Sequence, residues 1–125
     1  MLPITVIFLF IMMISFEGIG QWAATFACDE HVVEGQVVKP CGNSMVAACA
    51  AGDGFCGVAA VVGDSTACAV VMGGMVTVPY SGSAPGLGWS GLCADGAGGV
   101  KADTAGQKFM VVDVDTTDEM VTFVL

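Results

Sequence analysis

With 125 residues, the chain is long enough for one domain with a hydrophobic core. Three basic residues, all lysines, stand against 12 acidic residues, for a formal net charge of -9. Nucleic acid and anionic membrane surfaces are poor partners for such a chain, because phosphate binding requires clustered Lys and Arg. We interpret the acidic excess as serving solubility alone in an apolar chain, and attraction to a basic patch on a partner is the alternative.

The first segment, residues 2–14 (LPITVIFLFIMMI), is apolar and uncharged. It falls short of the roughly 20 residues that a membrane-spanning helix needs. Three interpretations remain open: a signal peptide, a buried strand or anchor, or sequence upstream of a true start at Met12 or Met13. No Lys or Arg precedes the run, and the nearest small-x-small site is the Gly-Ile-Gly of 18–20, which counts against a signal peptide.

From Trp22 onward the chain is a series of short apolar runs separated by glycine-rich turns. Strands at a spacing of about 8–12 residues with such turns are typical of a barrel or sandwich. We therefore predict an all-β fold, a small single-domain β-barrel or β-tulip-like sandwich with an apolar N-terminal extension and no internal repeat. The predicted strands, in chain order, are 22–27, 36–40, 45–49, 55–62, 67–72, 75–80, 91–95, 99–102 and a final hairpin of 110–114 and 121–125.

The final hairpin has two strands joined by a polar turn at 115–118. In each strand, alternate residues are apolar and should face inward. Phe123→Ala is therefore expected to be costly, whereas the carboxylates should remain at the surface. The predicted core residues are Met110, Val112, Val114, Val121 and Phe123, and the predicted surface residues are Asp113, Asp115 and Asp118.

Several patterns resemble chemical motifs but lack what the chemistry requires. Residues 18–23 match G-x-G-x-x-A, yet a dinucleotide site needs a helix to begin there, and a strand follows. The six cysteines form no C-x-x-C pair, which argues against zinc. His31 lies near Cys28 without an evident orienting group or oxyanion pocket. The cysteines are either disulfide-bonded, if the chain is exported, or small apolar strand residues, which we favour.

The acidic hairpin is a second chemical candidate. Asp113, Asp115 and Asp118 have the spacing D-x-D-x-x-D, which supplies hard oxygens for Ca²⁺ but lacks the Gly and distal Glu of an EF-hand loop. Solvated turn carboxylates are the commoner outcome. A glycosidase would need a cleft lined by aromatic residues, whereas Trp22, Tyr80 and Trp89 are scattered along the chain. We expect no enzyme activity, no metal and no cofactor.

Three stretches, 14–26 (ISFEGIGQWAATF), 76–89 (VTVPYSGSAPGLGW) and 94–125, together resemble a known family in order and spacing. They are similar to small head decoration, or capsid cement, proteins of tailed bacteriophages and prophages. The resemblance covers residues 13–125 and carries no catalytic residue. It divides the chain into an apolar extension, 1–12, and a β-barrel decoration-type domain, 13–125. Because the family opens close to the "SFEGIG" motif, the resemblance favours a start at Met12 or Met13.

This resemblance implies a structural virion protein that binds the outside of an expanded capsid and stabilises the major capsid lattice. It implies a homotrimer, with the major capsid protein as partner and with neither nucleic acid nor membrane bound. The implied location is the virion surface, and the bacterial cytoplasm during assembly. The alternative is a secreted, disulfide-bonded β binding or adhesin module, if residues 1–20 are a signal. The residues expected to form a capsid-contact arm are Ser15, Phe16, Glu17, Gly18, Ile19, Gly20 and Gln21.

Overall fold

A computed structural model describes residues 20–63 and 67–125, and these residues form ten strands and no helix. The all-β fold class and the β-barrel are therefore confirmed. The described part of the chain holds no helix that is long and apolar enough to cross a membrane. The strands are β1 (Trp22–Cys28), β2 (Val37–Gly42), β3 (Met45–Ala48), β4 (Gly57–Val62), β5 (Ala67–Gly73), β6 (Met75–Ser81), β7 (Gly88–Ala94), β8 (Val100–Ala102), β9 (Gln107–Asp115) and β10 (Met120–Val124).

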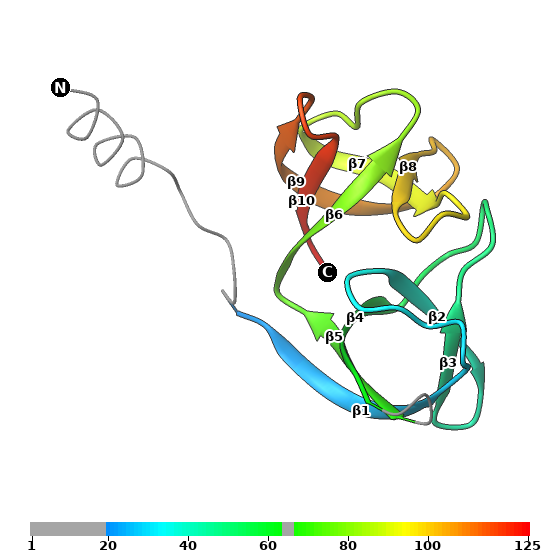
Figure 1. Cartoon of the computed structure of the whole chain (residues 1–125). Helices are drawn as coiled ribbons and strands as arrows, with labels where there is room; N and C mark the ends of the chain where they lie inside the picture. The colour runs from blue at the N-terminus through cyan, green and yellow to red at the C-terminus, as the bar shows by residue number, and fades with distance from the viewer. Residues whose placement is uncertain (1–19, 64–66) are drawn as a thin grey trace, which may run out of the picture.

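The strands close into two barrels rather than one (Figure 1). The first barrel has the strand order β1-β3-β2-β4-β5, and the second has β6-β8-β7-β9-β10, which is the same connectivity. In each barrel the first strand pairs antiparallel with the fifth and parallel with the third. The prediction of no internal repeat is therefore wrong, and the sequence conceals the repeated topology because equivalent inward positions hold different residues. Cys28 in the first barrel and Tyr80 in the second occupy equivalent positions. Each pairs across the parallel strands with a buried valine, Val46 and Val100 respectively.

A β-bulge interrupts the fourth strand of each barrel. In β4 the register shifts between Ala59 and Val61, and in β9 it shifts between Val111 and Asp113. One extra residue on a strand reverses which side chains face inward beyond it. The prediction that Met110 and Val112 are core residues is therefore wrong, since both are half-buried. The buried residues of β9 are instead Phe109 and Val111.

The other predicted residues of this hairpin lie as expected. Val121 and Phe123 are fully buried, and Val114 packs against the same cluster. Asp113 and Asp118 are exposed, and Asp115 is half-buried in the turn.

The hydrophobic core of the second barrel extends into the first barrel, which also has a core cluster of its own. The segment between β3 and β4 leaves the first barrel and carries Phe55 into the second, where its ring stacks on Phe109 with centroids 5.0 Å apart. The same ring meets Phe123 edge-on at 5.9 Å. The sequence predicted a strand from residue 55, but β4 begins at Gly57. Two backbone hydrogen bonds, from Gly52 N–H to the Ala94 carbonyl and from Ala94 N–H to the Asp53 carbonyl, hold this segment against β7.

Candidate functional site

The expected capsid-contact arm is described only at its end. Ser15, Phe16, Glu17, Gly18 and Ile19 lie outside the described residues. The last two arm residues, Gly20 and Gln21, lead directly into β1.

Gly20 and Gln21 lie beside Gly74 and Met75, where the chain passes from the first barrel to the second. Gln21 donates a hydrogen bond from Nε2 to the Met75 carbonyl at 2.7 Å. Gly20 and Gly74 both have positive φ, +66° and +89°, and a Cβ on Gly74 would lie 2.5 Å from the Gly20 carbonyl carbon. A side chain at Gly74 would therefore displace Gly20 and Gln21 from this position.

Among the described residues, the large apolar side chains exposed to solvent are Trp22, Val33, Met45, Val61, Leu87 and Trp89. Trp22 is 58% exposed, Leu87 is 70% exposed and Trp89 is 68% exposed. Trp22 pairs with Gly73 on β5, and its indole covers that glycine so closely that a Cβ there would overlap it. The indole thus lies against the sheet, and more than half of the residue remains exposed. Of Trp22, Leu87 and Trp89, the sequence placed only Trp22 in a predicted strand, and strand alternation does not say which face of that strand stays exposed.

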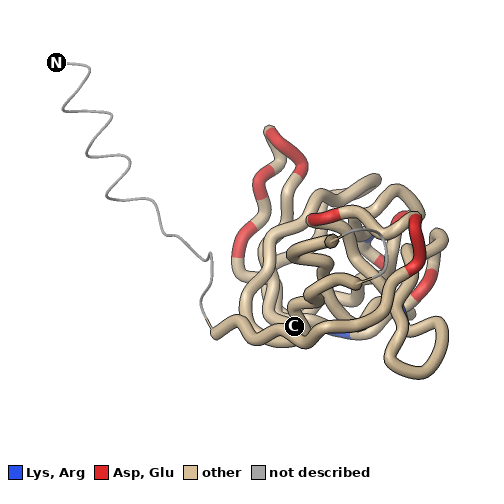
Figure 2. Tube along the Cα trace, turned by 60° about the horizontal axis from the view of Figure 1, so that its bottom comes forward, with Lys and Arg blue, Asp and Glu red and all other residues tan. Residues whose placement is uncertain are grey.

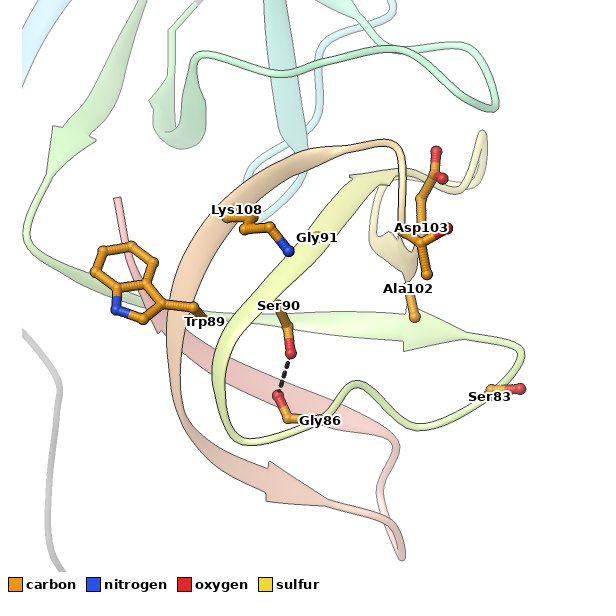
Figure 3. A pocket seen from close by; sticks show the side chains of 9 residues that line it. Ser83, Gly86, Trp89, Ser90, Gly91, Ala102, Asp103 and Lys108 are labelled. Atoms are coloured by element: carbon orange, nitrogen blue, oxygen red, sulfur yellow. Dashed lines mark hydrogen bonds between the residues drawn. The ribbon is translucent and has the colours of Figure 1, made fainter.

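A shallow pocket of about 420 Å³ lies beside Trp89 (Figure 3). Its polar groups include Ser90, which donates to the Gly86 carbonyl at 2.6 Å, and the side chains of Asp103 and Lys108. The Trp89 indole points away from Lys108 and Asp103 in Figure 3. The Trp89 ring is therefore not placed to stack on a sugar that contacts Asp103 and Lys108.

Asp103 is already engaged by the protein. The backbone N–H of Ala105, and secondly the Cys93 thiol, lower the pKa of its carboxyl group. A carboxylate whose charge is stabilised in this way is a weak base at neutral pH.

A second pocket of about 270 Å³ collects His31, Asp29, Lys39 and Cys49. His31 Nδ1 lies 2.6 Å from Asp29 Oδ1, and the backbone N–H of His31 donates to the same oxygen. These two contacts lower the pKa of Asp29, the backbone contact most. Burial, followed by the charge of Asp53, raises the pKa of the Cys49 thiol to about 11. Cys49 is therefore protonated at neutral pH and is a poor nucleophile.

The pairing of Cys28 with His31 that the sequence suggested is replaced by a different contact. Cys28 is buried in β1, and its thiol hydrogen-bonds with that of Cys68 on the neighbouring strand β5. Burial first, and then this contact, raise the pKa of Cys68 to about 11. All six cysteines are free thiols. Cys28, Cys68 and Cys93 are buried, Cys49 and Cys56 are half-buried, and Cys41 is exposed.

The acidic hairpin uses its carboxylates to build the turn. Asp115 Oδ1 accepts the backbone N–H groups of Thr117 at 2.9 Å and Asp118 at 3.1 Å. This is the local pattern by which aspartate stabilises a turn. Among residues 20–63 and 67–125, no three His, Cys, Asp or Glu side chains are arranged to hold a metal ion.

No protein-family model matches the chain, and no curated protein matches it either. The candidate site therefore rests on the geometry of the described residues. Its components are the exposed side chains of Trp22, Leu87 and Trp89 and the segment that enters β1.

Proposed function

We propose that this protein is a structural virion protein that binds the outside of an expanded phage capsid and stabilises the major capsid lattice. The observation that carries the proposal is the position of the exposed apolar side chains. Trp22 lies in the first stretch of the family resemblance, 14–26, and Leu87 and Trp89 lie in the second, 76–89.

Exposed tryptophans have the properties of interface anchors. A tryptophan that is more than half exposed leaves a large apolar area in contact with water, and binding a partner removes that area. Trp is among the residues that contribute most to protein–protein binding energy. The Trp22 indole lies against Gly73 of the neighbouring strand and Trp22 is still 58% exposed, so it has apolar area left to bury against a partner.

Charge provides the second argument for a protein partner. Acidic residues lie on a projecting hairpin and along the opposite side of the molecule (Figure 2). With a formal net charge of -9, the protein is attracted to a basic surface over about one Debye length, roughly 10 Å at 0.1 M salt. A capsid exterior with a basic patch at the binding position would use this attraction, and binding should weaken as salt is added.

Stabilisation of a shell requires binding to one of its states only. A ligand that binds the expanded lattice and not its precursor stabilises the expanded form by mass action. We propose that the protein acts as a homotrimer, because linked sites gain about 10²–10⁴ in avidity from individually weak contacts.

Co-sedimentation with expanded and unexpanded heads of the cognate phage tests this function. The wild-type protein should pellet with expanded heads and remain in the supernatant with unexpanded ones. Equal binding to both heads, or binding to neither, would leave a β binding module of another kind. Sedimentation velocity of the protein alone tests the trimer.

Variants locate the binding surface. Trp89→Ala should weaken head binding about 30-fold or more if it removes a hot spot of about 2 kcal/mol. Leu87→Ser should weaken it in the same direction. Val61→Ser is the matched control, because Val61 is 59% exposed and lies outside all three stretches of the resemblance. An equal effect of Val61→Ser and Leu87→Ser would show that the assigned surface is wrong.

A further inference from the structure

Cys28 and Cys68 form a pair of buried thiols where the first and last strands of the first barrel meet. Phe26 on β1 lies opposite Cys68 on β5, so Cys28 lies diagonally across this ladder from Cys68. Both side chains belong to the core cluster of the first barrel, and the two residues are 5% and 2% exposed. Their thiols are in hydrogen-bond contact. The two sulfur atoms therefore lie side by side and are shielded from solvent.

The second barrel fills the matching positions with larger apolar side chains. Tyr80 corresponds to Cys28, since each pairs with a buried valine across the parallel strands. Val121 in β10 corresponds to Cys68, because it pairs with the residue two places before Tyr80. Tyr80 and Val121 are both buried, so packing of large side chains joins β6 to β10 there. In the first barrel the same place holds two thiols.

The first barrel also has the weaker core. Among the described residues, those buried in its own cluster are valine, alanine and cysteine, whereas the second barrel buries Phe109, Phe123 and Leu92. Small side chains remove less apolar surface from water, so the first barrel gains less stability from its core. All the cysteines except Cys93 lie in the stretch of chain from β1 to β5. Thiols are therefore concentrated where packing contributes least.

We propose that Cys28 and Cys68 form a disulfide when the protein meets a small-molecule disulfide oxidant, and that this bond holds the first barrel closed. The bond joins the two strands that complete the barrel, and the loop it closes contains β2, β3 and β4. Closing such a loop restricts the unfolded chain and thereby stabilises the fold. In a reducing compartment the thiols stay free, and in an oxidising one the bond forms. This redox-sensitive bond goes beyond the proposed function, which needs no disulfide.

The reaction is thiol–disulfide exchange in two steps. The thiolate of one cysteine attacks the S–S bond of the oxidant, which forms a mixed disulfide and releases one thiol. The thiolate of the other cysteine attacks the protein sulfur of that mixed disulfide and releases the second thiol. The two cysteine protons end on the released thiols, and two electrons reduce the oxidant. Burial first, and then the contact with Cys28, raise the pKa of Cys68 to about 11, so the reaction is slow and proceeds through local opening of the barrel.

The diagonal arrangement makes the bond reversible. Diagonal partners across an antiparallel pair lie farther apart than directly opposed ones. The bond therefore draws the end of β1 toward the start of β5, and this strain makes it easier to reduce than an unstrained disulfide. Cys28 is the last residue of β1 and Cys68 the second of β5, so the shift is confined to strand ends.

Incubation of the full chain with oxidised glutathione at mildly alkaline pH, followed by intact mass and peptide mapping, tests the proposal. The wild-type protein should lose two hydrogens, apart from any glutathione bound to exposed Cys41, and yield peptides joined through Cys28 and Cys68. Its Tm should rise by about 3–10 °C and return after treatment with dithiothreitol. Cys28 and Cys68 still unlinked after oxidation would overturn the proposal. So would a bond between them that leaves the Tm unchanged or lower.

Two variants separate this bond from other effects of oxidation. Cys28→Ala removes one partner, so its Tm should not respond to the oxidant. Cys93→Ala is the matched control, because it removes a buried thiol from the second barrel and should show the full wild-type rise. An equal rise in both variants would refute the assignment to Cys28 and Cys68, and the wild-type map decides the matter if Cys28→Ala does not fold. Head binding is scored separately with reduced protein, so a protein that forms the bond and binds no heads refutes the proposed function alone.

Discussion

Phe55 should be the residue that makes the two barrels unfold as one unit. It arises from the segment between β3 and β4, yet its ring is 8% exposed and lies among residues of the second barrel. It stacks on Phe109 with an interplanar angle of 10° and meets Phe123 at 63°. We expect Phe55→Ala to destabilise both barrels together, although the substitution lies outside every strand.

The magnitude follows from burial and ring contact. Truncating a buried phenylalanine to alanine costs about 3–5 kcal/mol through lost transfer free energy and the cavity left behind. Aromatic pairing contributes about 0.5–1.5 kcal/mol beyond the buried area. Phe55→Leu fills most of the space without the stacking, so it should cost less than about 1.5 kcal/mol.

Urea unfolding monitored by tryptophan fluorescence and by circular dichroism measures these free energies. The wild-type protein should unfold in one transition that coincides for both probes. Phe55→Ala should lower the midpoint by roughly 1–5 M, given a loss of about 3–5 kcal/mol and a slope of about 1–3 kcal/mol/M. A double-mutant cycle between Phe55→Ala and Phe109→Ala should give a coupling energy of at least about 0.5 kcal/mol.

Two results would refute the reasoning. A loss below about 1 kcal/mol in Phe55→Ala would mean that the ring contributes little to the shared core. Strict additivity with Phe109→Ala would mean that the stacked contact between the barrels is not formed.

Further predictions concern the second-barrel core, the thiols, one ion pair and the acidic turn. Phe123→Ala should cost about 3–5 kcal/mol in the same urea assay, because Phe123 is fully buried. Thiol titration after denaturation without reductant should find six free thiols, with Cys41 the first to react in the native protein; two or three reproducible disulfides would favour the secreted module. Asp53→Asn should slightly lower the Tm at pH 7, because a hydrogen bond from Lys39 and one from Ala50 N–H lower the pKa of Asp53. That stabilisation is present above the ordinary value of 3.8 and is lost as the pH falls through the lower folded pKa, so the wild-type and variant Tm values should converge in acid. Asp115→Asn should leave the Tm nearly unchanged, because the amide oxygen still accepts the turn N–H groups, and a rise in Tm with added Ca²⁺ would revive a metal site.

Local sequence determined where the strands and turns lie. The run of 67–72 became β5, and 75–80 became β6, because alternating apolar residues and glycine turns act over a few neighbours. The final hairpin likewise formed around Asp115, whose carboxylate satisfies the turn by itself. In the candidate site, the sequence identified the segment that enters β1, but it gave no sign that Gln21 would bind Met75 of the second barrel.

Tertiary structure decided which faces are buried, and it did so through partners distant in the chain. The bulge at Val112 depends on how β9 meets β10, and it moved the core from Met110 to Phe109 and Val111. The exposure of Trp22 and Trp89 depends on which surfaces the two barrels leave uncovered. Alternation assigns a side chain to one of two faces of a strand, but only the assembled barrels determine which face meets solvent. Register, bulges and open edges therefore followed from long-range pairing, which no window of a few residues contains.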